Sequence, residues 1–447
     1  MTAAIVGGGI AGLVAAYELV KAGERPFLIE PGPLGGMISS SELNGFTLEH
    51  GPNVLVERPD LKELLSELGL ASDSVYPSVN PYGQYVWYKE RPVKVPAGLF
   101  EFIKSPLFEI SSKALLPIKA LIPGVLSSGA DSDRSVSEFF APLIGRRGVN
   151  HLLDPVLKGI YGGDVTKLSA RSLFSGLWSA AEDHKSLLGY MRARKSGGKP
   201  PILVVRGGMK RIADALWREI EAHVELITSP VQRINPSSGH RFVISMVGGR
   251  QVEADGVIVT VAGQRLSPLV PGLSEELADA LLNTRYATLH VAHLHVPRSE
   301  PLIPAAFGVL FPGGMPEDLL GVMFNSLIFP HVAPSDKHIL TVVLGGAQAG
   351  ARVFEEAKLR SKIPVLLKQL LNISNANWIG MRQWPTAIPQ LEVGHHNLVA
   401  KLDQCEHEFP GLVFAGVDRG GVGVSDRIRL AKEAVKRFRR LRVETVV

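Results

Sequence analysis

The feature that most constrains this chain is the glycine-rich run GGGIAGL at residues 7–13. The apolar residues Ala3–Val6 predict a buried strand before it, and Ile10–Lys21 has the pattern of a helix after it. In a G-x-G-x-x-G turn, the first glycine permits the turn, the second lets the main chain approach a diphosphate, and the third lets helix and strand pack closely. The sequence therefore predicts a dinucleotide site formed by Gly7, Gly8, Gly9, Ile10, Ala11 and Gly12.

An acidic residue follows at the place where such a site needs one. Pro26–Glu30 predicts the next strand, and Glu30 ends it about 20 residues after the glycines, where a carboxylate accepts hydrogen bonds from ribose hydroxyls. A carboxylate there disfavours NADP, which needs a cation near its ribose phosphate. A second glycine turn, Gly35 and Gly36, follows so soon that we favour FAD. A plain loop is the alternative for these two glycines.

The chain carries a second glycine-rich segment near its other end. Leu412–Gly416 predicts a strand, GGVGV follows at residues 420–424, and a helix begins there with Ser425 or Asp426 as its cap. We expect main-chain amides of this segment to meet the same cofactor at its pyrimidine edge, with a tight turn lacking any ligand as the alternative. Nucleotide-binding patterns at both ends predict a discontinuous domain.

Composition excludes several other classes of protein. With 447 residues, 45% of them hydrophobic and 20% charged, the chain has the make-up of a folded protein of about two to four structural units. Its single cysteine, Cys405, excludes an intrachain disulfide and a cysteine-rich zinc site. The net charge of +5 suits anionic small molecules or a membrane surface, and the sequence has no nucleic-acid-binding module.

The apolar N-terminus resembles a signal peptide or a membrane anchor at first sight. No basic segment precedes it, Glu18 and Lys21 end it, and three consecutive glycines suit a strand-turn-helix unit better. Elsewhere the sequence has no uninterrupted apolar run of about 18 residues. We therefore expect a cytoplasmic protein and leave peripheral membrane contact open.

The pattern of elements predicts an α/β + α fold with a discontinuous Rossmann-like FAD-binding domain, a mixed α+β substrate domain and a helical insert. Helical patterns mixed with prolines and lysines fill residues 92–195, and alternating strands and helices resume after the polar stretch RARKSGGKPP. The expected division is FAD-binding domain 1–60, 196–265 and 385–447, connection 61–91, helical and membrane-leaning insert 92–195, and substrate domain 266–384.

Taken together, these stretches resemble the oxygen-dependent protoporphyrinogen oxidase and coproporphyrinogen III oxidase family, FAD flavoproteins of the monoamine-oxidase-like fold. GGGIAGL is shared by many flavoproteins. IYGGD at residues 160–164, IPQ with the downstream GH at 388–395, and GVGV at 421–424 are more specific. The matching stretches occur in family order over nearly the whole chain.

The resemblance implies further cofactor contacts. Gly51, Pro52, Asn53 and Val54 would line the isoalloxazine ring, and Val231 would contact the adenine through its main chain. Trp384, Val422, Gly423 and Val424 would border the ring. No cysteine or histidine stands at an evident attachment point, so we expect the FAD to be non-covalent. Val417-Asp418-Arg419, Leu391 and Arg427 depart from the family's usual residues, which puts fine contacts in doubt rather than the cofactor.

For the substrate, the resemblance implies a flat porphyrinogen lying against Leu310, Met323 and Val343. The alternative is that all three are ordinary core residues. Lys89, Arg91 and Lys94 lie near where the family holds a propionate, and of these we select Arg91 and Lys94. Solvated surface cations are the alternative. We assign no catalytic acid or base and no metal ligand.

The implied activity is oxidation of protoporphyrinogen IX or coproporphyrinogen III to the porphyrin in haem biosynthesis. A methylene carbon would lose a hydride to flavin N5, and molecular oxygen would accept the electrons to give hydrogen peroxide. Ferrochelatase or another enzyme of haem synthesis would be a partner. The alternatives are an amine oxidase or carotenoid desaturase of the same fold, and a catalytically inactive FAD-binding partner protein.

Two other features are set aside. His395-His396 are expected on a strand, where neighbours face opposite ways and do not share a metal ion. The basic residues of the last helix are expected to form a solvated face, with Ile428, Ala431, Val435 and Phe438 on the buried one.

Overall fold

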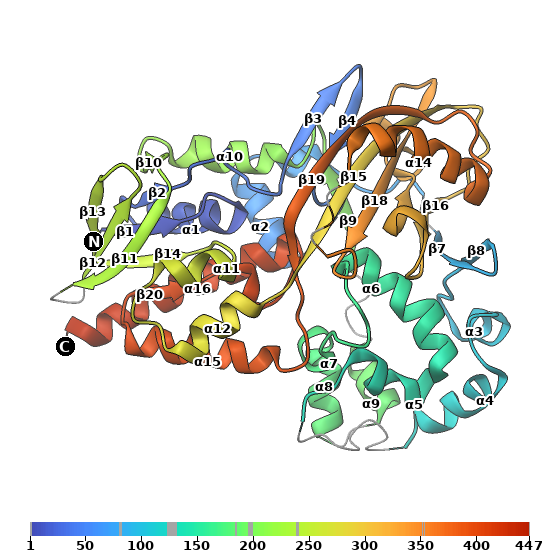
Figure 1. Cartoon of the computed structure of the whole chain (residues 1–447), viewed down its shortest axis with the longest axis horizontal. Helices are drawn as coiled ribbons and strands as arrows, with labels where there is room; N and C mark the ends of the chain where they lie inside the picture. Colours follow the sequence, from blue (N-terminus) through green and yellow to red (C-terminus); the bar gives the residue numbers. More distant parts are fainter. Residues whose placement is uncertain are drawn as a thin grey trace.

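The computed structural model describes residues 2–446 except 80–82, 123–131, 184–185, 195–199, 238–240, 351 and 353, with side chains described as far as Arg440. Three regions are visible in Figure 1: a parallel sheet with its helices at the left, a long antiparallel sheet at the upper right, and a group of helices below that second sheet. Strands β15 and β19 run from the first region into the second.

The parallel sheet contains both ends of the chain. Its strand order is β10 (Glu225–Ile227), β2 (Phe27–Ile29), β1 (Ala3–Val6), β14 (Gly256–Val259) and β20 (Leu412–Phe414). All pairs are parallel, and Val6 is in register with Ile29 on one side and Val259 on the other. Because the carboxyl ends of parallel strands meet at one edge, the loops after β1, β2, β14 and β20 lie together there, and such an edge binds ligands.

Alternating residues of this sheet pack on two layers. Ile5, Leu28 and Ile258 face the core shared by α1 (Ile10–Lys21), α2 (Pro59–Glu67), α10 (Lys210–Ile220) and α16 (Val424–Val446). On the other side, Val6 and Phe414 pack against a three-stranded sheet and three helices, which are β11 (Val231–Ser237), β12 (Arg241–Met246), β13 (Gln251–Ala254), α11 (Gly263–Leu266), α12 (Glu275–Asn283) and α15 (His395–Glu408).

The second region is one sheet of seven strands, which pair antiparallel except for one parallel pair. In spatial order they are β19 (Asn377–Pro389), β15 (Tyr286–Pro297), β18 (Lys337–Gly346), β17 (Leu319–Met323), β16 (Ala306–Leu310), β7 (Gly83–Tyr88) and β8 (Arg91–Lys94). One face is covered by α14 (Glu356–Leu371), through Leu359, Ile363 and Leu367. The short helix α13 (Asn325–Ile328) follows β17.

Helices occupy the chain between β8 and β9 (Ile202–Val205). They are α3 (Leu99–Lys104), α4 (Ile110–Lys119), α5 (Val136–Gly148), α6 (Asp154–Tyr161), α7 (Ala170–Leu173), α8 (Ser175–Glu182) and α9 (Leu187–Arg194). Ser135 begins α5 with a capping box, because its side chain accepts from the Glu138 amide while Glu138 accepts from the Ser135 amide. No helix in the described part of the chain is both long and apolar enough to cross a membrane.

Short pairings complete the fold. The hairpin of β3 (Ser40–Leu43) and β4 (Phe46–Glu49) stands beside α10, and a small sheet contains β5 (Leu55–Val56), β9 (Ile202–Val205) and β6 (Ser74–Val75). Two of the expected boundaries, 91/92 and 384/385, fall inside β8 and β19 of the seven-stranded sheet, and the boundary at 195/196 lies outside the described residues. The division into domains therefore stays a prediction.

Candidate functional site

The first glycine turn leaves β1 at the ligand-binding edge of the parallel sheet. Gly7 has a φ of +107°, and a Cβ on it would lie 2.5 Å from Thr260 Oγ1. A Cβ on Gly12 would lie 1.8 Å from the Gly7 carbonyl oxygen, so only glycine allows α1 to pack here. A Cβ on Gly9 would meet no atom within 4 Å. The turn thus leaves open space beside Gly9, as a bound diphosphate requires.

Glu30 is fixed at the same edge by main-chain donors. The Gly8 amide donates to Oε2 at 2.7 Å and the Gly32 amide donates to Oε1 at 2.8 Å. Thr260, which sequence reasoning missed, donates from Oγ1 to the Gly7 carbonyl at 3.0 Å from the end of β14. The predicted carboxylate therefore lies directly against the predicted turn, and each carboxylate oxygen accepts from one main-chain amide.

A second layer of loops packs on this turn. The Gly35 amide donates to the Gly8 carbonyl at 2.9 Å, and a Cβ on Gly36 would lie 3.2 Å from the Gly9 Cα. Gly51 is equally constrained, because a Cβ on it would lie 1.9 Å from the Met37 carbonyl oxygen. The expected contact loop 51–54 is thereby held next to the first glycine turn.

The structure also brings Trp384 to the start of this loop, and it brings α16, which begins at Val424, to the residues after the loop. Trp384 Nε1 donates to the His50 carbonyl at 2.6 Å, although the two residues come from distant parts of the chain. At the start of α16, Ser425 donates to the Val56 carbonyl and Asp426 lies 3.2 Å from Arg58. Val231 begins β11, in the layer on the other side of the parallel sheet. The roles of these residues toward FAD stay predictions.

The second glycine segment is held by buried charged side chains. Asp418 is 3% exposed, and it accepts from the Gly263 amide at 2.7 Å and from the Tyr286 hydroxyl. Burial raises the pKa of the Asp418 carboxyl and the pKa of the Tyr286 hydroxyl.

Arg427 holds the same segment through hydrogen bonds to its main chain. It is 5% exposed and donates to the carbonyls of Gly416 and Gly420, which lie at the two ends of the stretch 416–420. Burial lowers its pKa to about 10. Two of the departures noted in the sequence thus form this anchor.

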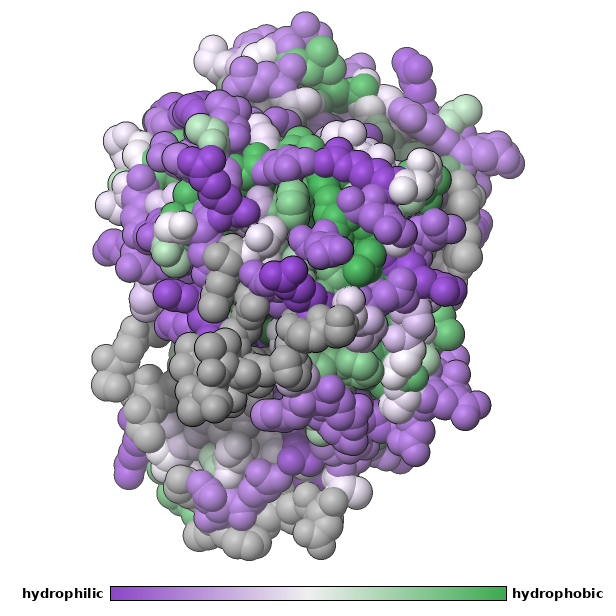
Figure 2. Space-filling view, turned by 90° about the vertical axis from the view of Figure 1, so that its left-hand side faces the viewer, coloured by the Kyte–Doolittle hydropathy of each residue, from purple (hydrophilic) through white to green (hydrophobic). Residues whose placement is uncertain are grey.

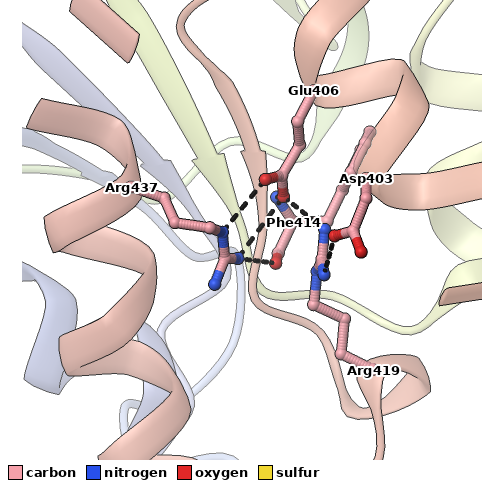
Figure 3. A network of polar contacts seen from close by, with 5 residues as sticks. All are labelled: Asp403, Glu406, Phe414, Arg419 and Arg437. Carbon is pink, nitrogen blue, oxygen red and sulfur yellow. Dashed lines mark hydrogen bonds and ion pairs between the residues drawn. The ribbon is translucent and has the colours of Figure 1, made fainter. Parts of the chain in front are cut away.

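A third departure, Arg419, joins a neighbouring ionic network (Figure 3). Glu406 of α15 is buried and accepts from Arg419 at 2.6 Å, from Arg437 of α16 at 3.0 Å and from the Phe414 amide at 2.8 Å. The expectation of a solvated basic face on the last helix is therefore wrong in part. Because α16 lies between α1, α2 and β20, three of its cations point to packed neighbours. These are Arg427, Arg437 and Lys432, and Lys432 forms an ion pair with Glu63.

The three predicted substrate residues share one face of the seven-stranded sheet, opposite α14. Leu310 pairs with Gly321, and Gly321 pairs in turn with Val343. Met323 lies in the next row, paired with Gly308. Residues directly opposite each other point to the same face, and all three side chains are half-buried. We call the face formed by Leu310, Met323 and Val343 the wall. A Cβ on Gly159 of α6 would lie 2.5 Å from Leu310, so α6 covers the Leu310 end of the wall.

The two cations predicted to bind a substrate propionate, Arg91 and Lys94, are not equivalent. Pairing of Tyr88 with Arg91 and of Val86 with Val93 places Arg91 on the face of Leu310. Lys94 falls on the opposite face, and it forms an ion pair with Glu101 at 3.1 Å. Both side chains are exposed at the β8 edge of the sheet. The structure thus separates Lys94 from the wall and keeps Arg91 at its far border.

A polar chain that the sequence did not reveal connects the loop 50–54 to this wall. Asn325 donates to Asn53 Oδ1 at 2.8 Å and to Thr341 Oγ1 at 3.2 Å, and the ring of His293 lies 5.3 Å from that of His50. Burial lowers the pKa of His293 to about 3, so this ring is neutral at pH 7. Within the described part of the chain, His50 Nδ1, His293 Nε2 and Asn325 Oδ1 are buried without a hydrogen-bond partner. Such atoms suit the polar edge of a bound cofactor or an ordered water.

The histidine pair set aside above lies on a helix rather than a strand. His395 and His396 begin α15. His395 bonds Ser172 at 3.1 Å and the Asp418 carbonyl at 2.6 Å, while His396 lies 3.5 Å from Asp133. The glycine before them, with φ +89°, lies in the turn that leads into the helix. No cluster of three potential metal-binding side chains occurs among the described residues.

Sequence reasoning also missed Arg382, two residues before Trp384 on β19. Its guanidinium lies 5.1 Å from the centre of the Trp384 ring, and its charge contributes to the lowered pKa of His50, after the larger effect of burial. The signal that was available is the strand period of two, which places Arg382 and Trp384 on one face once β19 is recognised as a strand.

Comparison with known proteins finds relatives over nearly the whole length of the chain. The chain is 27% identical to protoporphyrinogen oxidase 2 of Arabidopsis thaliana, covering 95% of this chain and 91% of the relative, and 27% identical to coproporphyrinogen III oxidase of Bacillus subtilis, covering 96% of both. A crystal structure from an Exiguobacterium species, described as that of a candidate protoporphyrinogen oxidase, superimposes with a TM-score of 0.81 at 22% identity, over 97% of this chain and 98% of that one.

The fold extends to other chemistries. A UDP-galactopyranose mutase superimposes with a TM-score of 0.72 at 16% identity, over 98% of this chain and 94% of that one. The comparisons confirm the expected resemblance and fold, and the expected cofactor, FAD. The sequence matches the flavin containing amine oxidoreductase family over residues 10–427, and the chain belongs to that family.

Proposed function

We propose that this protein oxidises a porphyrinogen, protoporphyrinogen IX or coproporphyrinogen III, to the porphyrin, with molecular oxygen as acceptor and hydrogen peroxide as by-product. The observation that carries the proposal is the wall formed by Leu310, Met323 and Val343 on one face of the sheet. A flat apolar ring suits such a face, because its binding is mainly burial of apolar surface. The names of the relatives at 27% identity support the same substrate class.

The residues of the chain would orient the substrate and exclude water. The sheet wall supports one side of the ring, and α6, which packs on Leu310, closes one end. Bound FAD supplies the acceptor for hydride in this family. His293 is kept neutral by burial, so its ring adds no positive charge beside the wall. We expect a haem-synthesis enzyme such as ferrochelatase to take up the product.

We further propose that FAD is bound non-covalently along the carboxyl edge of the parallel sheet, with its diphosphate at Gly9, its ribose at Glu30 and its adenine at the main chain of Val231. The isoalloxazine ring would lie between the loop 51–54, Trp384 and the segment 422–424. The single cysteine supports a non-covalent cofactor. Cys405 is buried in α15 and burial raises the pKa of its thiol to about 12, so it is no nucleophile at neutral pH.

We also propose that α3 and α4 rest on an anionic lipid surface. The end of the molecule at the left of Figure 1 is mainly hydrophilic, as Figure 2 shows, whereas α3 and α4 lie at the opposite end. Together with the turn that follows α4, these helices carry exposed hydrophobic residues beside the cations Lys104, Lys113 and Lys119. The exposed hydrophobic residues are Leu99, Phe100, Ile103, Ile110, Leu115, Ile118, Leu121 and Ile122. Apolar side chains flanked by lysines are typical of interfacial helices.

A flotation experiment with phosphatidylglycerol and phosphatidylcholine vesicles tests this surface. We expect the protein to float with the anionic vesicles, and Ile110→Ser with Ile118→Ser to abolish flotation. Val365→Ser, at an exposed hydrophobic residue on α14, is the control. Equal flotation of all variants would place the contact elsewhere.

The activity is tested with the purified protein, FAD and oxygen against both porphyrinogens, a monoamine and a carotenoid. We expect porphyrin fluorescence to appear faster than in a protein-free control, with hydrogen peroxide formed alongside. Turnover of the amine or the carotenoid alone would favour another enzyme of this fold. Bound FAD without any turnover would favour an inactive FAD-binding partner protein.

A further inference from the structure

The wall of the proposed substrate site ends at an arginine. In the row that crosses the seven-stranded sheet, Leu310 pairs with Gly321, Gly321 with Val343, Val343 with Val291, and Val291 with Arg382. Each member of such a row points to the same face. Arg382 on β19 therefore extends from the face that carries the wall, at the border nearest the expected cofactor loops.

The guanidinium has no carboxylate partner within the described part of the chain. No ion pair or hydrogen bond involves it there, and the side chain is exposed. Its guanidinium stacks on the Trp384 ring at 5.1 Å and lies near His50, which burial keeps neutral. Stacking orients the planar guanidinium while leaving its N–H donors free. An oriented cation without an acidic partner is suited to bind an anion.

The other cations near the wall are less well placed. Lys94 points to the opposite face and is paired with Glu101. Arg91 lies on the wall's face but on β8, beyond β7, at the other border of the sheet. Strands are spaced about 4.8 Å apart, so the Cα of Arg382 lies about 10 Å from that of Val343, two strands away. A ring lying on Val343 brings its substituents within reach of Arg382.

We propose that Arg382 binds a carboxylate of the substrate and so makes the enzyme select the free acid over its ester. This inference rests on the proposed function. Arginine binds a carboxylate bidentately, and the carboxylate is separated from the reacting carbon atoms of the ring because it stands at the end of a side chain. The contact would then strengthen substrate and transition state alike, which lowers KM and leaves kcat unchanged.

The experiment compares the free acid of a porphyrinogen with its methyl ester on holoenzyme variants. Arg382→Leu should raise KM for the acid by about tenfold, which corresponds to about 1.4 kcal/mol, with kcat and the KM of the ester nearly unchanged. Arg382→Lys should recover part of the loss, because it keeps the charge without the bidentate geometry. Arg360→Leu, an exposed arginine of α14 behind the same sheet, is the matched control.

A binding measurement without turnover accompanies the kinetics. The absorption band of the porphyrin product should shift on titration with wild type, and Arg382→Leu should weaken this binding for the diacid but not for the diester. FAD content, read from the flavin spectrum, should be equal in all variants. Equal losses for acid and ester, or lost FAD, would mean that Arg382 supports the fold or the cofactor, and would overturn the inference. So would an acid-specific loss in Arg91→Leu alone. Wild type that oxidises no porphyrinogen would overturn the proposed function, and the inference with it.

Discussion

The two glycine-rich segments reach the same edge of the parallel sheet, but they are held there by different means. Around Gly7, Gly9 and Gly12 the shape depends on side chains that are missing, since a Cβ on Gly12 would lie 1.8 Å from a carbonyl oxygen. Around 416–424 the shape depends on side chains that are present, chiefly Asp418 and Arg427. A turn of the first kind is damaged by adding atoms, and a loop of the second kind by removing them.

The largest effect should come from adding a side chain where the first turn is open. Gly9→Val would place its methyl groups in the space left for the diphosphate, so we expect FAD affinity to fall by about a hundredfold or more, or about 3 kcal/mol. The apoprotein should unfold at the same temperature as wild type, because no protein atom lies within 4 Å of the new Cβ. Flavin fluorescence titration and calorimetry of the apoprotein measure the two quantities. Gly12→Ala is the contrasting variant and should lower apoprotein stability itself. Full FAD occupancy in Gly9→Val would show that the diphosphate lies elsewhere.

A smaller effect should come from removing a side chain at the second loop. Arg427→Met would remove the buried guanidinium that donates to the carbonyls of Gly416 and Gly420, and we expect the free energy of unfolding to fall by about 2–3 kcal/mol. Arg429, whose side chain is 40% exposed and pairs with Glu433 one helical turn away, provides the control. Arg429→Met should cost less than about 0.5 kcal/mol. Chemical denaturation of the apoproteins measures both. Similar values for the two variants would contradict the anchoring role of Arg427.

The smallest effect concerns a buried carboxylate close to the first turn. Glu49 accepts from Ser40 and from the Met209 amide at the start of α10, and burial raises its pKa to about 7. Because this value exceeds the unfolded one, Glu49 contributes stability below about pH 4.5 that is lost as pH rises through 7. Relative to Glu49→Gln, wild type should therefore lose about 1–3 kcal/mol of unfolding free energy between pH 4.5 and 8. Glu42→Gln, on the exposed strand of the same hairpin, should follow wild type. Parallel pH profiles for wild type and Glu49→Gln would refute the shifted pKa.

The contrast between the two segments also explains what the sequence predicted. Strand β1 and helix α1 have the bounds that hydrophobic pattern indicates, and β2 lies within the predicted Pro26–Glu30, because local periodicity and glycine spacing determine this unit. The anchor of the second loop was not predictable, since Asp418 meets Gly263 and Tyr286 only after distant segments pack. The same holds for Glu406, whose position in the sequence gives no sign that it is buried between Arg419 and Arg437.

The substrate wall shows the same division. Leu310, Met323 and Val343 were chosen by resemblance, and strand register brings them to one face. The distinction between Arg91 and Lys94 needed that register, because neighbouring positions in a strand differ only by which face they point to. His395 was predicted on a strand, whereas a helix begins directly after Gly394.

The most direct test of the account is the flavin content of the purified wild-type protein before and after acid precipitation. If the two glycine-rich segments hold FAD without a covalent bond, the protein should be yellow, carry about one FAD per chain, and release all of it into the supernatant. A colourless protein that takes up no FAD on titration, or flavin that stays with the pellet, would contradict this account.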